Sequence, residues 1–150
     1  MPHKKETLIL ATGFPWSEDV QTEILNLGEE ECTQLPDFPI ELREASGALI
    51  KEKYPLICGG FDGAQIREDC YLLGSSYEKF TKLLGPRSRH ANLVLSDSIW
   101  ITGGVPNFKS STEFVHFNGT VERGPELPIT VRDHSIEWLN DFQAILIGGR

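Results

Sequence analysis

The chain has few of the residues that build metal sites, disulfide frameworks or membrane spans. Its three cysteines, Cys32, Cys58 and Cys70, show no CxxC spacing, which argues against a structural zinc site. The apolar run at residues 8–11 is far too short to cross a bilayer, and no signal-peptide cleavage pattern follows it. Basic residues are scarce, 14 against 22 acidic ones, so the formal net charge of -8 disfavours nucleic acid and anionic membranes as partners.

Glycine and proline are, by contrast, plentiful. The 150 residues include 14 glycines and 9 prolines, which favour turns and disfavour long helices. The hydrophobic fraction of 39% is enough to bury a core, so we expect one folded domain or part of a larger one.

Glycine pairs recur at an even spacing. Gly59-Gly60, Gly103-Gly104 and Gly148-Gly149 each follow a short apolar run, and Gly13 ends a degenerate fourth copy. Successive pairs start 44 and 45 residues apart, which is typical of repeat architectures. Each period holds four short β-rich segments bounded by turn residues, such as the hairpin signal Asn118-Gly119. Four antiparallel strands in such a period form one blade of a β-propeller.

These repeats resemble those of the kelch β-propeller family, from about residue 7 to residue 149. The resemblance rests on the apolar run ending in Gly-Gly, on a downstream strand that begins with an acidic residue, and on the Pro86-Arg87-Ser88-Arg89 element. One family feature differs, because the usual fourth-strand tryptophan is replaced by Cys32, Phe80 and Val121. The predicted fold class is an all-β, partial kelch-type β-propeller of about three four-stranded antiparallel blades.

Residues 1–150 are predicted to form one incomplete propeller domain, with repeats ending near residues 13, 60, 104 and 149. The predicted strands group as three, four, four and two along the chain. Because a closed propeller needs roughly 4 to 8 blades, we expect a segment of a larger propeller or a ring completed by self-association.

Arginines recur in step with the glycines. Arg43, Arg87 and Arg132 each lie sixteen residues before the first glycine of a pair, and Arg89 lies close to Arg87. In a propeller these positions surround one mouth of the central channel, and the resemblance implies that such a rim binds acidic peptide motifs. The alternative is that each arginine pairs with an acidic residue of the next blade, one of those that repeat at the start of the third strand. These residues are Glu23, Asp69 and Glu113.

No catalytic residue, metal or other cofactor is predicted. The Gly-Gly pairs lack the rest of a phosphate-binding motif, so we assign them a structural role in which positive φ permits close strand approach. His90 and His134 both follow arginine-bearing segments, but a metal site needs three or four ligands. The enzyme alternative is a galactose-oxidase-like propeller whose catalytic residues lie outside this chain.

The cysteines and one asparagine bear on the cellular compartment. A hairpin centred near residue 64 places Cys58 opposite Cys70, which suits either a disulfide or two reduced core residues. Asn118-Gly119-Thr120 is an N-glycosylation sequon at a hairpin tip, although Asn-Gly also suits the turn by itself. These features leave the compartment open.

The predicted function is non-enzymatic recognition of a protein partner of unknown identity. The loops between second and third strands carry Trp16, Phe61 and Phe108, aromatic residues that suit an interface as well as packing between blades. Intracellular proteins with such propellers include substrate adaptors of ubiquitin ligases and actin-associated proteins. We prefer that interpretation to the alternative of an extracellular adhesion module.

Overall fold

A computed structural model describes residues 7–11, 22–26, 32–107 and 110–150, and these residues form thirteen β-strands. No helix among them is long and apolar enough to cross a membrane. In chain order the strands are β1 (Thr7–Ala11), β2 (Thr22–Asn26), β3 (Cys32–Leu35), β4 (Ser46–Ile50), β5 (Tyr54–Cys58), β6 (Asp69–Leu73), β7 (Tyr77–Lys82), β8 (Ala91–Val94), β9 (Ser98–Thr102), β10 (Thr112–His116), β11 (Val121–Arg123), β12 (His134–Asn140) and β13 (Gln143–Gly148).

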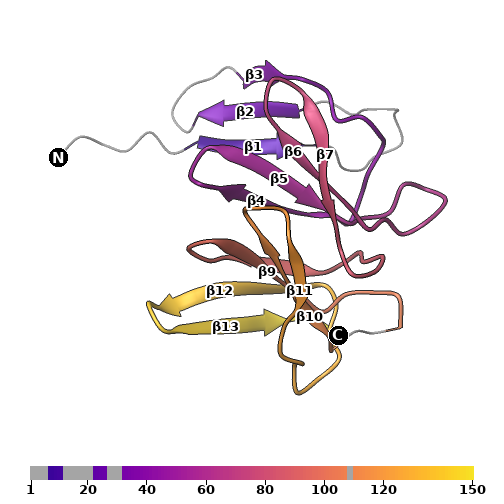
Figure 1. Cartoon of the computed structure of the whole chain (residues 1–150), viewed down its shortest axis with the longest axis vertical. Coiled ribbons are helices and arrows are strands. Elements are labelled where there is room, and N and C mark those ends of the chain that lie inside the picture. The colour runs from indigo at the N-terminus through magenta and orange to yellow at the C-terminus, as the bar shows by residue number, and fades with distance from the viewer. Residues whose placement is uncertain (1–6, 12–21, 27–31, 108–109) are drawn as a thin grey trace.

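The strands form four antiparallel sheets in which every strand pairs with its neighbours in sequence. Sheets β1–β3 and β4–β7 occupy the upper half of Figure 1, and β8–β11 and β12–β13 the lower half. The predictions of an all-β chain and of four-stranded antiparallel sheets are confirmed, and the strands group in the expected order of three, four, four and two. Among the first strands of successive sheets, β8 contacts both β4 and β12, so these sheets meet along the edges that their first strands form.

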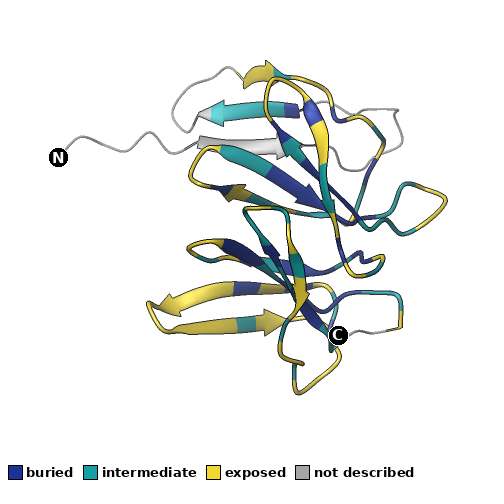
Figure 2. Ribbon diagram, viewed as in Figure 1, coloured by how far each residue is buried: buried dark blue, intermediate teal, exposed yellow. Residues whose placement is uncertain are grey.

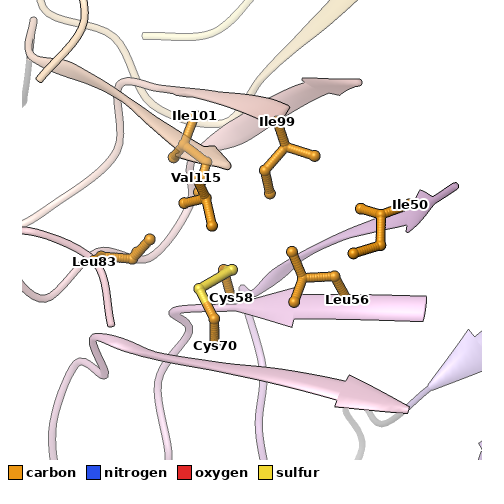
Figure 3. Packing of buried hydrophobic residues seen from close by; sticks show 8 residues of the cluster. All are labelled: Ile50, Leu56, Cys58, Cys70, Leu83, Ile99, Ile101 and Val115. Carbon is orange, nitrogen blue, oxygen red and sulfur yellow. A yellow bond between two sulfur atoms is a disulfide. The ribbon is translucent and has the colours of Figure 1, made fainter. Parts of the chain in front are cut away.

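The largest core cluster lies between the two four-stranded sheets. Their middle strands are buried on both faces, which explains why the runs that form them are almost continuously apolar (Figure 2). Side chains of β4–β6 meet those of β9 and β10, with Leu83 closing one side (Figure 3). The buried residues of this cluster are Ile50, Leu56, Cys58, Cys70, Leu83, Ile99, Ile101 and Val115.

A second cluster covers the other face of the β4–β7 sheet. The Phe38 ring meets Tyr71 and Tyr77 edge-on, with ring centroids 5.1 and 4.7 Å apart. The Thr22 hydroxyl of β2 donates to the Tyr77 hydroxyl at 3.3 Å, which links this sheet to β1–β3. The four-stranded sheet is therefore packed on both faces.

The β12–β13 sheet is far more exposed (Figure 2). Leu139 and Phe142 are 62% and 91% exposed at its turn. Trp138 is held by a hydrogen bond from its indole nitrogen to the Val94 carbonyl at 3.1 Å. Near the start of β12 the sheet is packed, because Ile136 joins Ala91 and Leu93 in a small core cluster.

The first glycines of two pairs, Gly59 and Gly103, lie where the next sheet approaches closely, whereas no atom of the described residues lies within 4 Å of a Cβ at Gly148. Gly103 has φ of +64°, a conformation that costs residues with a Cβ about 1–2 kcal/mol. A Cβ at this position would collide with the Val131 carbonyl oxygen and would lie 2.7 Å from the His134 ring. The glycine pair is thus needed for both backbone conformation and sheet packing, the structural role that the sequence predicts.

We expect Gly103→Ala to lower the free energy of unfolding by roughly 2–3 kcal/mol, because the new methyl adds a backbone clash to the φ penalty. Urea unfolding measures the change. Gly74→Ala is the matched control, since no atom lies within 4 Å of a Cβ there. Equal stability of the two variants would contradict the assigned role of Gly103.

Candidate functional site: an arginine-bearing end of the sheets

Three loops at one end of the sheets are built in the same way. Arg43 and Phe61 exchange two backbone hydrogen bonds, with N–O distances of 3.0 and 2.7 Å. Ser88 pairs with Val105 at 3.1 and 2.9 Å, and Arg132 pairs with Arg150 at 3.2 and 3.1 Å. In each copy the residue after the glycine pair is therefore fixed to the segment that leads into the first strand.

These backbone pairings show that the three arginines are not structurally equivalent. The pairing makes Ser88, not Arg87, the structural equivalent of Arg43 and Arg132. Three residues separate the paired Ile50 and Tyr54 in the β4–β5 hairpin, whereas two separate Leu95 and Ser98, which pair through a backbone hydrogen bond in β8–β9. The β12–β13 hairpin has a bulge after Trp138. Equal spacing along the chain therefore does not place Arg87 with the other two. Its structural equivalents are Leu42 and Val131, which take the same place beside the second glycine.

Arg87 lies inside the protein, where it forms an ion pair with Glu113 of β10. The two residues are only 3% and 1% exposed. Arg87 Nε donates to Glu113 Oε1 at 3.0 Å, and Nη2 lies 2.8 Å from the same oxygen. Burial lowers the pKa of the Arg87 guanidinium, while Glu113 acts in the opposite direction. Arg87 thus contacts a repeated carboxylate, but one within its own sheet rather than in the neighbouring one.

Further hydrogen bonds complete this ion pair. Arg87 Nη1 donates to the carbonyl oxygens of Gly103 at 2.5 Å and Ser111 at 2.9 Å. The Leu84 backbone N–H donates to Glu113 Oε2 at 2.7 Å. The guanidinium thus joins β9, β10 and the segment before β8, and it is not presented to a partner protein.

Arg89 lies just before β8, between two acidic residues. Its Nε is 3.0 Å from Asp133 Oδ1 and 3.6 Å from Glu44 Oε1. The backbone repeats the contact, because Arg89 N donates to Glu44 O at 2.9 Å and Asp133 N donates to Arg89 O at 3.0 Å. All three residues have φ between +55° and +59°. They are equivalent residues of successive sheets, joined in a ladder of hydrogen bonds.

Arg43 and Arg132 lie next to this ladder and are half-buried. The Arg43 guanidinium is stacked over the Phe61 ring, 4.8 Å from its centroid. Arg132 Nε is 3.9 Å from Asp133 Oδ2, and Arg150 Nε is 3.2 Å from the same oxygen. The structure therefore brings Arg43, Phe61, Arg89 and Arg132 to one end of the sheets. Trp16 and Phe108 lie outside the described residues.

A charged pocket of about 400 Å³ adjoins this end, and sequence reasoning did not predict it. Arg67 Nη2 and Lys79 Nζ contact the two oxygens of Asp69 at 2.7 and 3.2 Å, and Lys82 Nζ contacts Glu68 at 2.9 Å. Burial raises the pKa of Asp69, but hydrogen bonds from Arg67 and Lys79 outweigh it, so the net shift is downward. The pocket lies between the loop before β6 and the strand β7, and of its charged residues only Asp69 belongs to the repeated acidic positions.

His90, just before β8, and His134, the first residue of β12, pack against the neighbouring sheet. Both rings lie against the first glycine of the preceding sheet's pair. His134 Nε2 is 2.8 Å from the Thr102 hydroxyl. Burial lowers the pKa of His134, although nearby Asp133 raises it. No group of three or more His, Cys, Asp or Glu side chains suited to a metal occurs in the part of the chain that the structure describes.

The remaining predicted sites lie away from the arginines. Cys58 and Cys70 face each other across β5 and β6 and are joined by a disulfide, whereas Cys32 is an exposed free thiol. Asn118 is exposed on the β10–β11 turn.

Comparison with known proteins assigns this chain to no family. No protein-family model matches the chain, and no curated protein matches it. The kelch resemblance therefore depends on the repeated residues themselves.

Proposed function

We propose that the sheets are blades of a kelch-type β-propeller that recognises a protein partner without catalysis. The observation that carries the proposal is the repeated loop at one end, where the same backbone pairing recurs at Arg43, Ser88 and Arg132. Contacts among the first strands β4, β8 and β12 support a radial arrangement with these loops around the inner edge. Such loops can vary in sequence while the blades hold them rigidly.

The charge of this end favours an acidic partner. Arg43, Arg89, Arg132 and Arg150 gather there beside Glu44 and Asp133, in a chain of net charge -8. Guanidinium groups bind carboxylates with two parallel hydrogen bonds, and a neighbouring aromatic ring such as Phe61 adds apolar contact. We infer that the end binds an acidic peptide segment.

A short fluorescent peptide of alternating Glu and Gly tests this function by fluorescence polarisation. We expect it to bind the chain, and we expect Arg43→Glu combined with Arg132→Glu to weaken binding at least about tenfold, the effect of losing one charge-assisted hydrogen bond. Lys51→Glu combined with Lys53→Glu is the charge-matched control, because both lysines are exposed on the β4–β5 turn at the opposite end of the sheet.

The same peptide with Gln in place of Glu separates charge recognition from general adhesion. Equal binding of the Glu and Gln peptides, or an equal loss in the Lys51→Glu/Lys53→Glu control, would refute the proposed recognition of acidic segments.

A further inference from the structure

The Cys58–Cys70 disulfide is part of the main hydrophobic core. Cys58 and Cys70 are a directly opposed pair on β5 and β6, and they are 1% and 0% exposed. They lie in the cluster that joins the two four-stranded sheets (Figure 3). At the same register of the next sheet the pair is Thr102 and Thr112, so the fold itself does not require cysteines there. Buried disulfides of this kind form in oxidising compartments and are rare in the cytosol.

The Asn118 turn presents a glycan acceptor in an ordered conformation. Asn118 Oδ1 accepts hydrogen bonds from Thr120 N at 3.0 Å and from the Thr120 hydroxyl at 2.7 Å. Both residues are exposed. The turn is anchored on its other side, because the Thr81 hydroxyl donates to the Gly119 carbonyl at 2.7 Å. Asn118 is thus exposed on a turn that these hydrogen bonds hold in place.

From these two features we propose that the chain folds in the secretory pathway of a eukaryotic cell and carries an N-linked glycan on Asn118. The disulfide forms when the two thiols give two electrons and two protons to a disulfide-bearing oxidoreductase, which is reduced to its dithiol. The glycan arrives from a lipid-linked oligosaccharide pyrophosphate. A bond forms between Asn118 Nδ2 and the sugar C1, the bond from C1 to the phosphate oxygen breaks, and the lipid pyrophosphate leaves as Nδ2 loses a proton.

The glycan position leaves the arginine-bearing end clear. β10 runs from Thr112, opposite Thr102 and next to the glycine pair, to His116, opposite Ser98. Asn118 follows His116 and therefore lies at the far end of the sheet from Arg87 and Arg89. Its turn meets the β8–β9 turn, where Phe117 N donates to Asp97 O at 2.8 Å. This proposal reverses the preference for an intracellular protein and does not depend on peptide binding.

Peptide mapping of the protein purified from its native source tests both modifications together. Trypsin releases residues 54–67 and 68–79 as separate peptides, and we expect a non-reducing digest to contain them joined through Cys58 and Cys70. The peptide of residues 110–123 should carry sugar, and peptide N-glycanase in heavy-oxygen water should convert Asn118 to labelled Asp. Thiols at Cys58 and Cys70 that react with an alkylating agent, or a peptide 110–123 that is found only unmodified, would overturn the proposal.

A matched pair of variants checks that the sugar follows the sequon. When the full chain is secreted from cultured animal cells, Thr120→Ser should keep the glycan and Thr120→Ala should lose it, while both secrete the disulfide-linked protein. Glycanase-sensitive mass that persists in Thr120→Ala would assign the glycan to another site and refute Asn118. Acidic-peptide binding should be the same with and without the glycan.

Discussion

Replacing Arg87 with leucine will destabilise the protein by about 3–5 kcal/mol, because it leaves the Glu113 carboxylate charged and buried without its partner. Glu113 is 1% exposed, and the Leu84 backbone N–H would remain its one hydrogen-bond donor among the contacts described. Glu113→Leu should cost a similar amount, since it strands the guanidinium. Urea unfolding of the full chain, followed by tryptophan fluorescence, measures both losses.

The two changes together should cost much less than their sum. In the β4–β7 sheet the structurally equivalent residues are Leu42 and Tyr71, which lie in one buried apolar cluster. The fold therefore accepts an apolar pair at these places, and replacing a buried ion pair by apolar residues is often nearly neutral. We expect Arg87→Leu/Glu113→Leu to recover at least half of the loss in a double-mutant cycle. Additive losses would show that the bonds from Arg87 to Gly103 and Ser111 matter more than its charge pairing.

The strands and the glycine pairs could be predicted from the sequence because they depend on local rules. Short apolar runs form strands, Asn118-Gly119 forms a turn, and a glycine pair with positive φ stands at the ends of β5, β9 and β13. Cys58 and Cys70 could be placed opposite each other for the same reason, since one hairpin contains both.

The side-chain partners could not be predicted in the same way. Counting residues along the chain treats Arg43 and Arg87 as equivalent, but a one-residue difference in hairpin length moves Arg87 from the surface loop into the core. The acidic residues show the same effect. Asp69 and Glu113 occupy the same place in the sequence repeat. The strand register nevertheless makes Tyr71 the structural equivalent of Glu113, because Tyr71 lies opposite Ile57 as Glu113 lies opposite Ile101. Asp69 consequently contacts Arg67 and Lys79 in the charged pocket.

Removing the Cys58–Cys70 disulfide should be the second large loss, about 3 kcal/mol in the free energy of unfolding. The bridge closes a loop with a sequence separation of 12 residues. A loop of this length restricts the unfolded chain by about 3 kcal/mol in the chain-entropy account. The protein unfolded in urea with a strong reductant and refolded in its presence should show a midpoint lowered accordingly, as should Cys58→Ala/Cys70→Ala.

The reduced wild-type protein separates the loss of the bridge from the loss of packing. It keeps both sulfur atoms in the core cluster beside Leu56 and Val115, whereas the double alanine variant also leaves a cavity. The variant should therefore be the less stable of the two, and its midpoint should not respond to reductant. Cys32→Ser should leave the midpoint and its response to reductant as in the wild type, because Cys32 is exposed and free. A wild-type midpoint that is the same after refolding with and without reductant would show that the bridge adds no stability, and the core alone would then hold the two four-stranded sheets together.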